Sequence, residues 1–522
     1  MKQLVTLNFL RANKPLLLTL ALFMPIFLWA YFFTVPAEDA VILYEYSKNL
    51  AERGLITYGG SQIPIEGATD FLWMLLIAIM KTIGLSEFAS ALVLNFFGIF
   101  LILNLFNKSK VRLWIIFTIL LTPFFYASLN GFSAIFFVAL HLIVLKLFFT
   151  KNRWLYAAVF ILCLVRPDGV VWCMGVVLLN ILDAIKRGKF ISESKRLTLH
   201  LLLPGLIYFG WRRSYFSEWL PLPFTVKSGQ PRDFGVFYYG SARTVVLVLV
   251  PLILTLLFYV KNKSTLLESL ILFGPPSIFY SSVVLEQNVG NRFMAPLFFG
   301  ATYYLYVKFG NKAFIVAIMF SILFLVRDTA VTIVKLFDSR IETVPYVARD
   351  LAEVKGRMLV TEAGRLTFYS GWKSEDSWGL NTPKFARELI SARNVNPSNY
   401  DLIVAHCDLS LLKTSISIDV KPDRTWFNQC RALVKGIKLN NYQVFLLPYR
   451  QEISFRDRIS RVASSYLFLS KNALRCERYD IYAISKEFGE YTQLTKTIKR
   501  YGAIEFDENL LLTGDKVCKN QE

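Results

Sequence analysis

Charged residues are scarce in this chain of 522 residues: only 18% are Asp, Glu, Lys or Arg, whereas 54% are hydrophobic and 45 are Phe. A soluble domain usually carries about a quarter charged residues. The composition therefore favours a polytopic membrane protein over a soluble one. Histidine is scarcer still, with His141, His200 and His406 only, so we do not expect histidine to carry the chemistry.

Several nucleotide and metal motifs are also missing. The sequence holds no Gly-x-Gly-x-x-Gly fingerprint, no Walker loop and no His-Glu-x-x-His motif, which argues against a nucleotide-binding fold and against a zinc protease. The net charge of +20 does not indicate nucleic-acid binding. Much of the positive charge lies in short clusters between apolar segments, a pattern typical of the cytoplasmic loops of membrane proteins.

Long apolar runs predict a polytopic α-helical membrane domain in the lipid bilayer with about eleven spans. The first run, after Lys2, Arg11 and Lys14, is long for a signal-peptide core and predicts an uncleaved span; cleavage after Ala37 is the alternative. The expected spans are 15–35, 88–106, 113–128, 131–149, 153–166, 169–185, 198–211, 243–260, 265–283, 293–308 and 313–335.

Basic turns set the expected topology. With the N-terminus in the cytoplasm, the cytoplasmic turns are basic and nearly free of acid, as the positive-inside rule requires. This agreement depends on the short run Phe71–Ile83 not crossing the bilayer, so we expect Thr69–Ile83 to form a helix at the outer membrane face. The basic residues of these turns are Lys108, Lys110, Arg112, Lys151, Arg153, Lys186, Arg187, Lys189, Lys195, Arg196, Lys261, Lys263, Lys308 and Lys312.

The C-terminal region differs in character from the rest. Alternating short strand and helix patterns predict a soluble α/β domain over 338–522, outside the cytoplasm, after a transmembrane domain over 1–337 whose first outer loop is 36–87. The expected strands include Arg357–Thr361, Asp401–Ala405 and Gln443–Leu447. Four cysteines fall in this region, and the simplest of three possible pairings is Cys407–Cys430 and Cys476–Cys518.

Two adjacent acids, Glu38 and Asp39, follow the first apolar run. Carboxylates are costly at a membrane boundary and invite a chemical explanation. Neighbouring carboxylates also tend to separate in pKa, which leaves one ionised as a general base. The alternative is structural, because the pair begins the amphipathic segment Asp39–Arg53 and acidic side chains favour a helix N-terminus.

This passage resembles the first outer loop of GT-C-type glycosyltransferases, and most of all that of the mycobacterial terminal arabinofuranosyltransferases and their bacterial relatives. The shared pattern is two acids and Ala, a helix ending near Asn-Leu, and Gly. Glu66-Gly67-Ala68-Thr69, followed by Leu72-Trp73, matches the next element. The resemblance implies a catalytic role for the acid pair. Family members carry Asp-Asp or Asp-Glu there, so Glu38 is a departure, and we favour Asp39 as the base.

The same resemblance implies further site residues. Arg292-Phe293, followed by Pro296, and the Leu220-Pro221 loop ending at Lys227 match basic elements of the family. Arg292, Lys227, Arg212 and Arg213 are therefore expected to bind the donor phosphate; pairing with Asp168, Glu218, Glu286 or lipid headgroups is the alternative. We expect Arg166 to fix its own turn through Asp168. Glu66, Trp73 and Tyr44 are the candidates for binding the acceptor or sugar, with turn and packing roles as the alternative.

The resemblance implies an integral membrane glycosyltransferase of the bacterial inner membrane. It would move a sugar, arabinofuranose by analogy, from a polyprenyl-phosphate donor to a hydroxyl of an envelope glycan or protein at the periplasmic face, with inversion. A divalent metal ion assists some members of the superfamily, but no ligand set in this sequence demands one. Two other classes stay open: a transporter or flippase of lipid-linked glycan, and a non-catalytic scaffold for envelope assembly.

Overall fold

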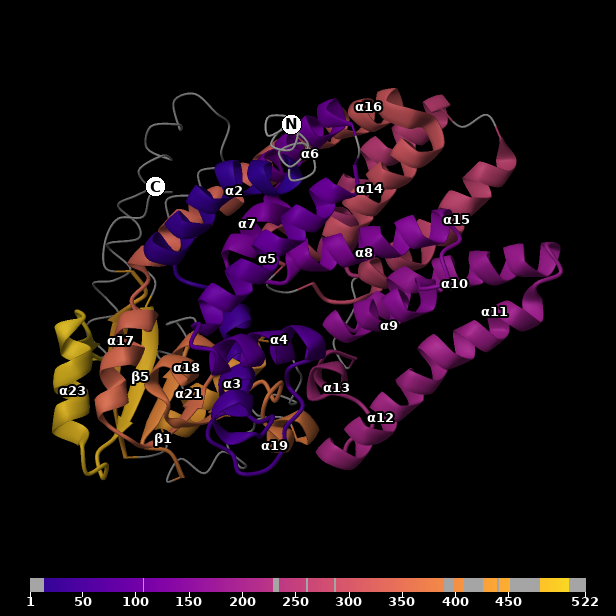
Figure 1. Cartoon of the computed structure of the whole chain (residues 1–522). Helices are drawn as coiled ribbons and strands as arrows, with labels where there is room; N and C mark the ends of the chain where they lie inside the picture. Colours follow the sequence, from indigo (N-terminus) through magenta and orange to yellow (C-terminus); the bar gives the residue numbers. More distant parts are fainter. Residues whose placement is uncertain are drawn as a thin grey trace, which may run out of the picture. The chain divides into compact units, whose positions relative to one another are not determined.

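The computed structural model describes residues 14–106, 108–228, 234–259, 262–285, 288–388, 399–407, 426–438, 441–450 and 479–506 (Figure 1). The chain divides into two compact units. The helical unit comprises Met1–Pro36, Asp70–Ser217 and Pro231–Leu336, and the mixed unit comprises Ala37–Thr69, Glu218–Gln230 and Phe337–Glu522. The mixed unit thus joins residues of the first predicted outer loop to the C-terminal region.

The helical unit consists of α-helices with short 3₁₀ and π segments. Most predicted apolar runs correspond to a helix, and the short predicted outer-face helix corresponds to α4. The elements are α2 (Lys14–Phe33), α4 (Phe71–Thr82), α5 (Glu87–Asn104), α6 (Ser109–Leu121), α7 (Pro123–Leu129), α8 (Ala134–Phe149), α9 (Leu155–Val165), α10 (Gly169–Lys186), α11 (Phe190–Leu197), η1 (Thr198–Leu202), α12 (Leu203–Phe216), α14 (Tyr239–Tyr259), α15 (Lys263–Ser282), η2 (Val289–Met294) and α16 (Ala295–Asp338).

Five described helices are long and apolar enough to cross a membrane, and a sixth counts if α6 and α7, bent by 68° at their junction, form one span. Eleven spans are therefore not confirmed. Several predicted runs form shorter helices, namely α8 and α9. The last two predicted runs fall within α16, which has a break at Gly310, where φ is 78°. The five are Pro15–Phe33, Glu87–Asn104, Gly169–Lys186, Tyr239–Tyr259 and Val289–Ile341.

Apolar side chains face outward from the helical unit, as expected of a surface in contact with lipid. Phe258, Leu206 and Leu323 are 75%, 70% and 69% exposed. Several buried polar groups inside the unit are hydrogen-bonded to backbone carbonyls. The buried Asn95 amide donates to the carbonyls of Ala91 and Phe132 at 2.9 and 2.8 Å. This distribution is the reverse of a soluble helical domain and agrees with a membrane protein.

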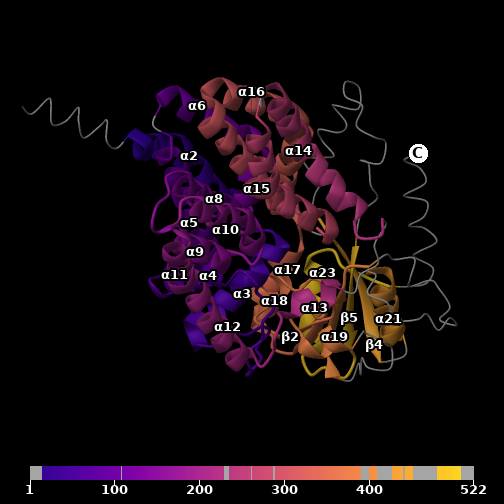
Figure 2. The same cartoon turned by 90° about the vertical axis from the view of Figure 1, so that its right-hand side faces the viewer.

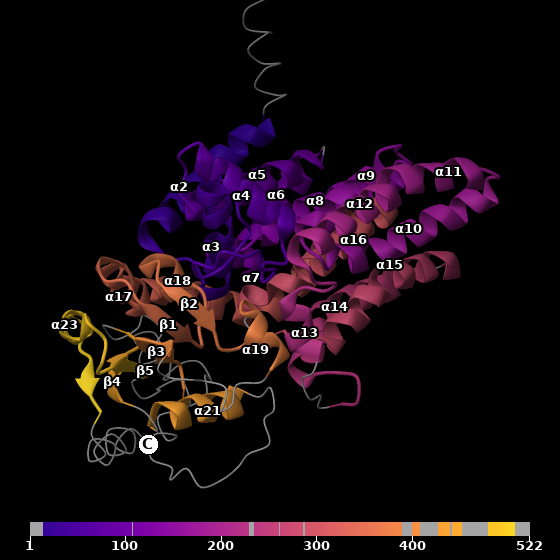
Figure 3. The ribbon, with the colours of Figure 1, turned by 90° about the horizontal axis from the view of Figure 1, so that it is seen from below.

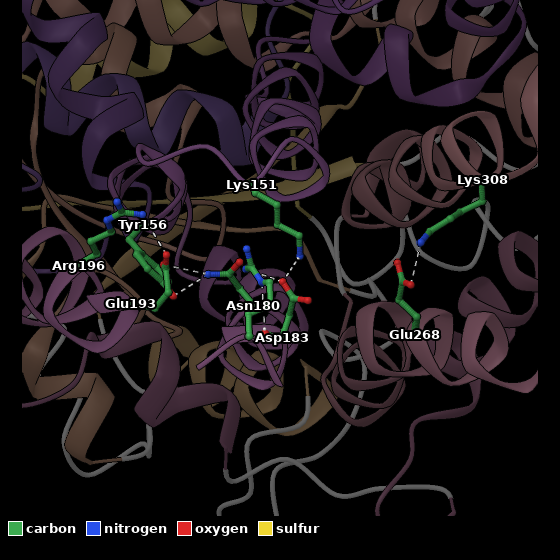
Figure 4. Close-up of polar contacts among 9 residues, drawn as sticks. Lys151, Tyr156, Asn180, Asp183, Glu193, Arg196, Glu268 and Lys308 are labelled. Atoms are coloured by element: carbon green, nitrogen blue, oxygen red, sulfur yellow. Dashed lines mark hydrogen bonds and ion pairs between the residues drawn. The ribbon is translucent and has the colours of Figure 1, made fainter. Parts of the chain in front are cut away.

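Ion pairs link the basic turns of the helical unit (Figure 4). Lys151, after α8, and Arg187, after α10, both bind Asp183, at 2.7 and 2.6 Å. These contacts bring the C-terminal ends of α8 and α10 together, as expected of two helices separated by one antiparallel helix. Lys308 binds Glu268 of α15 at 2.8 Å in the same way. The Lys151–Asp183 pair thus places two predicted cytoplasmic turns, those after α8 and α10, at the same end of these helices.

A six-stranded mixed sheet forms the centre of the mixed unit, with strand order β2-β1-β3-β5-β4-β6. Strands β2, β1 and β3 are parallel, and β5 is antiparallel to both β3 and β4. Helix α21 covers one face, whereas α17 and α23 lie on the other (Figures 2 and 3). The strands are β1 (Arg357–Val360), β2 (Lys373–Asp376), β3 (Leu402–Ala405), β4 (Tyr442–Pro448), β5 (Tyr479–Ser485) and β6 (Ile504–Glu505).

Seven described α-helices complete the mixed unit. They are α3 (Glu38–Arg53), α13 (Leu222–Ser228), α17 (Val344–Asp350), α18 (Arg365–Ser370), α19 (Pro383–Arg387), α21 (Trp426–Lys438) and α23 (Tyr491–Arg500), with the short 3₁₀ turns η3 (Ser339–Ile341) and η4 (Leu351–Glu353) beside them. The three predicted strands are confirmed as β1, β3 and β4, and the predicted Asp39–Arg53 segment is confirmed as α3. Strand β2 escaped prediction because its sequence, Lys-Ser-Glu-Asp, is wholly polar.

Residues of the first predicted outer loop pack against the C-terminal sheet within the mixed unit. The fully buried Tyr58 donates its hydroxyl to the carbonyl of Ala363 at 2.6 Å, and the Ser374 amide within β2 donates to the carbonyl of Gly59 at 3.0 Å. Gly59 has a φ of 57°, and a Cβ there would lie 2.2 Å from the Ser374 carbonyl oxygen. Only glycine allows this close approach of two backbones.

A disulfide joins the end of β3 to α21. Cys407 and Cys430 are bonded, which confirms that predicted pair. The second predicted pair, Cys476–Cys518, lies outside the described residues. The Cys407–Cys430 bond anchors the segment that follows β3, including His406, whose carbonyl lies 3.8 Å from the Cys430 sulfur.

Candidate functional site

The acid pair forms the first turn of α3, after Ala37 in extended conformation. Both carboxylates therefore lie at the positive end of the helix dipole. The Glu38 carboxylate accepts hydrogen bonds from the backbone amides of Gly364 and Arg365, the latter at 3.1 and 3.0 Å to its two oxygens. Glu38 thus accepts hydrogen bonds from the first backbone amides of α18. These bonds join two segments that are more than 320 residues apart in the chain.

Arg365 lies between two carboxylates. Its Nε is 4.0 Å from Glu38, its guanidinium is bonded to Glu342, and its side chain is 8% exposed. Burial raises the pKa of Glu38, the Arg365 guanidinium and the two amides lower it, and Asp39 raises it, with a net rise above the ordinary value. Asp39 is the half-buried neighbour in the same turn. Glu38 is thus engaged by the α18 amides, and a role of Asp39 as the base stays a prediction.

A second polar group lies at one edge of the sheet. The register places the ends of β1, β3 and β4 beside the start of β5, since Val360 pairs with Val404, Ala405 with Ile481, and Pro448 with Tyr479. The side chains at this edge define what we call the edge cluster: Glu362 after β1, His406 after β3, Tyr449 after β4, and Asp480 and Tyr482 in β5. The carboxyl ends of strands in α/β sheets are a common place for ligand sites.

His406 is held in a fixed orientation within the edge cluster. Its Nδ1 lies 2.6 Å from the Asp480 carboxylate, its backbone amide donates to the Thr361 hydroxyl at 2.8 Å, and its ring lies 5.4 Å from that of Tyr449. A histidine oriented by a carboxylate is a common arrangement for proton transfer and recognition. We did not expect histidine to carry the chemistry, because the sequence has only three histidines. The position of His406 directly after a predicted strand was the signal that could have pointed to it.

Within the edge cluster, the Glu362 carboxyl has a strongly shifted pKa. Burial raises its pKa to about 8, and Glu38 adds to the rise while His406 opposes it. The neutral carboxylic acid is therefore the main form at neutral pH. A protonated carboxyl can donate a hydrogen bond, which a carboxylate cannot do.

This pKa has a consequence for stability. The native pKa of Glu362 lies above the ordinary value of 4.5, so the native state holds a proton that the unfolded state has released. We expect the stability of the mixed unit to fall as pH rises from about 4.5 to about 8. Burial also raises the pKa of Asp376, to about 6, and that of Glu38, so a variant of Glu362 is needed to identify its share of the slope.

Hydrogen-exchange protection of the β1 and β3 amides, followed from pH 6 to 8 and corrected for intrinsic exchange rates, measures this effect. Glu362→Gln should remove most of the slope because glutamine does not titrate. An unchanged slope in Glu362→Gln would contradict the assignment.

Glu66 and Tyr44 lie in the packed part of the mixed unit. Glu66 is 7% exposed, and its carbonyl accepts from the Leu222 amide at 3.1 Å. The neighbouring Gly67 donates its amide to the Tyr46 hydroxyl at 3.0 Å, and that hydroxyl donates to Asn381 at 3.0 Å. Tyr44 is 1% exposed, with its ring 6.2 Å from that of Phe368. These contacts are those of a packed turn, and any sugar contact by Glu66 or Tyr44 stays a prediction.

Lys227 is exposed near the end of α13 in the mixed unit. Glu218, one of the acids expected to neutralise the outer basic residues, is bonded instead to Arg387 of α19. An exposed Lys on a short helix can reach a phosphate as a point charge at little cost in desolvation. Its role at the donor phosphate stays a prediction.

Two guanidinium groups lie on either side of the Phe293 ring in the helical unit. Arg292 is 8% exposed, 4.6 Å from the Phe293 centroid and 3.8 Å from that of Phe132, while Arg166 lies 4.9 Å from Phe293. Arg166 also forms a two-point ion pair with Asp168, at 3.1 and 2.6 Å, which confirms that it fixes its own turn. The role of Arg292 at the donor phosphate stays a prediction.

The other predicted residues of the helical unit lie elsewhere. Arg212 and Arg213 are in the last turns of α12; Arg212 is 5% exposed and lies 5.3 Å from the Phe209 ring, while Arg213 is half-buried. Trp73 is 1% exposed in α4, with its ring 5.7 Å from that of Phe136. Its indole is packed among apolar side chains, so stacking on a sugar would need a rearrangement of α4.

In the part of the chain that the structure describes, no group of three or more His, Cys, Asp or Glu side chains is placed to hold a metal ion. The carboxylates of the mixed unit are instead paired with cations and amides, as at Arg365 and His406.

Comparisons with known proteins give little beyond this geometry. No protein-family model and no curated protein matches the chain. Among solved structures, the chain is similar to ArnT from Cupriavidus metallidurans in the apo state, with 12% sequence identity and a TM-score of 0.42. The match covers 80% of this chain and 97% of that protein. At this level of likeness the comparison assigns neither a fold nor an activity.

Proposed function

We propose that this chain is an integral membrane glycosyltransferase that moves a sugar from a polyprenyl-phosphate donor to a hydroxyl acceptor. The observation that carries the proposal is the acid pair Glu38 and Asp39 in the first turn of α3, directly after an apolar helix long enough to cross a membrane; we assign the role of base to Asp39. The GT-C resemblance of this loop supplies the reaction class.

The reaction needs one base and one anion-binding group. Asp39 removes the proton of the acceptor hydroxyl while its oxygen attacks the anomeric carbon of the donor sugar. The new C–O bond forms as the bond to the phosphate oxygen breaks, and polyprenyl phosphate leaves with the electron pair. A single displacement inverts the anomeric configuration. Asp39 ends the step protonated and then releases its proton to water.

The leaving phosphate needs positive charge. Arg292 fits this role because its guanidinium is buried among aromatic rings, where an ionic hydrogen bond is stronger than in water. Lys227 is the second candidate, and Arg212 and Arg213 are weaker ones. Asp39 and Lys227 belong to the mixed unit, and Arg292, Arg212 and Arg213 belong to the helical unit.

The side of the membrane on which transfer takes place, the sugar and the acceptor follow from the same resemblance. We place transfer at the periplasmic face of the bacterial inner membrane, with arabinofuranose as the sugar and an envelope glycan or protein as the acceptor. Positive turns of the helical unit, linked by the ion pairs of Lys151 and Lys308, support a common cytoplasmic end.

Replacement of Arg292 tests the phosphate assignment. Arg292→Gln removes an ionic hydrogen bond of about 1.5–3 kcal/mol, so we expect the donor Kd to rise by about 10–150-fold. Binding of a polyprenyl-phosphate sugar to purified protein in lipid nanodiscs measures this change, and transfer to an acceptor glycan is assayed in parallel.

Arg243→Gln provides a matched control, since Arg243 also lies in the helical unit, near the start of α14. Unchanged donor affinity in Arg292→Gln would count against the assignment. Translocation of the lipid donor with no sugar transfer by the wild-type protein would favour a transporter instead.

A further inference from the structure

Tyr482 carries a buried hydroxyl that the fold leaves unsatisfied. The residue lies in β5 and is 0% exposed, and its hydroxyl has no hydrogen-bond partner among the described residues. Buried polar groups are nearly always hydrogen-bonded, because an unbonded one loses its hydration without compensation. A phenylalanine would fill the same space without this cost. The hydroxyl therefore needs an explanation outside the packing of the sheet.

The Tyr482 side chain faces the edge cluster. Burial raises its pKa, and the charges of Asp480, Glu362 and Glu38 raise it further, in that order. In the strand register Tyr482 pairs with Val404 of β3 and with Phe445 of β4. Val404 lies one residue before the end of β3, and Phe445 lies three residues before the end of β4. Tyr482 and Asp480 are two residues apart in β5 and therefore lie on the same face of the sheet, where the charges of Glu362 and Glu38 also reach the Tyr482 hydroxyl.

The edge cluster suits a neutral ligand rich in hydroxyl groups. Glu362 offers a carboxylic acid that can donate, Asp480 orients His406 at 2.6 Å, and the Tyr449 ring lies 5.4 Å from that of His406, tilted by 53°. Glu362 and His406 are half-buried, so they mark the side from which a ligand enters. The described carboxylates do not converge in the way a metal site requires.

We propose that the edge cluster binds a sugar hydroxyl of the acceptor, with the Tyr482 hydroxyl and the Glu362 carboxyl as its hydrogen-bonding partners. This inference rests on the proposed transferase function and names the part of the mixed unit that takes the acceptor. It places the acceptor site in the same compact unit as Asp39, whose neighbour Glu38 accepts hydrogen bonds from the amides of Gly364 and Arg365, two and three residues after Glu362.

Two tyrosine variants separate ligand binding from stability. Tyr482→Phe removes the unsatisfied hydroxyl, so its melting temperature should equal or exceed that of the wild type, while sugar affinity should fall at least tenfold. Tyr442→Phe is the matched control on β4: its hydroxyl donates to the Tyr400 carbonyl at 2.6 Å, at the opposite end of that strand. It should melt at a lower temperature and bind sugar as the wild type does.

The assay uses full-length protein in detergent and saturation-transfer NMR with methyl α-D-arabinofuranoside, methyl α-D-mannopyranoside and methyl β-D-galactopyranoside, with cyclohexanol as the probe that lacks a polyol. At least one glycoside should bind, and cyclohexanol should not. If Tyr482→Phe fails to fold, Glu362→Leu at the half-buried rim takes its place, with the same expected loss.

Each of three results overturns the inference. The first is that no glycoside binds the wild type, and the second is that cyclohexanol binds as well as the glycosides. The third is that Tyr482→Phe, or Glu362→Leu in its place, keeps full sugar affinity, which would mean that the hydroxyl contacts only water. None of these binding measurements includes the donor. If Asp39→Asn abolishes transfer while Tyr482→Phe keeps sugar affinity, the inference fails and the proposed function stands. If Asp39→Asn transfers sugar normally, the proposed function fails.

Discussion

Asp39→Asn is expected to lower the rate of sugar transfer by about 10²–10⁴-fold, the usual contribution of a general base. Asparagine has nearly the shape of aspartate but cannot accept the acceptor's proton at neutral pH. Because Asp39 is not assigned to the phosphate, donor affinity should stay within about twofold of the wild type, as expected when only a transition-state interaction is lost. Single-turnover transfer from a radiolabelled polyprenyl-phosphate sugar measures the rate directly.

Glu38→Gln is the matched control for this prediction. Its carboxylate bonds the Gly364 and Arg365 amides, so a neutral side chain should weaken the tie to α18 and lower the melting temperature. It should nevertheless retain a larger share of the transfer rate than Asp39→Asn. The reverse order of rates would identify Glu38 as the base and would contradict the assignment of Asp39.

Arg365→Met is expected to destabilise the mixed unit by about 3–5 kcal/mol, the usual cost of removing one partner from a buried ionic group. The Arg365 side chain is 8% exposed, and methionine would leave the carboxylates of Glu38 and Glu342 buried without their shared cation. Since the chain has two compact units, an unfolding midpoint gives only the direction of a change and not the free energy of one unit. Hydrogen exchange of the β1 and α18 amides reports on the mixed unit itself.

Arg387→Met provides the comparison for Arg365→Met. Arg387 is bonded to Glu218, but its side chain is 67% exposed, and an exposed pair contributes about 1 kcal/mol or less. Protection in β1 should therefore change little in this variant. Equal losses in the two variants would show that the buried position of Arg365 does not matter.

The features that could be predicted from sequence are those set by local patterns. Strands β1 and β3 follow from apolar runs bounded by polar residues, and α3 follows from the amphipathic order of Asp39–Arg53. The Arg166–Asp168 pair spans two residues of one turn. The Cys407–Cys430 pair joins sequence neighbours among the cysteines. In each case the partners lie close in the chain, so the sequence alone limits the alternatives.

The features that could not be predicted depend on contacts between distant segments. The bonds from Glu38 to the α18 amides cross more than 320 residues, and no periodicity connects the two ends. The edge cluster draws its residues from the ends of four strands, and β5, which contributes Asp480 and Tyr482, was not predicted. The span count is not confirmed for a related reason: apolar composition does not show where a helix ends or bends, as at the α6–α7 junction.

Mass analysis of the cell-envelope glycans from the source organism tests the central claim most directly. Deletion of the gene should remove one sugar residue from one envelope glycan or glycoprotein, wild-type complementation should restore it, and complementation with Asp39→Asn, expressed at the same level, should not. Envelope glycans of identical mass with and without the gene, or full restoration by Asp39→Asn, would contradict the assignment of this chain as a glycosyltransferase that uses Asp39 as its base.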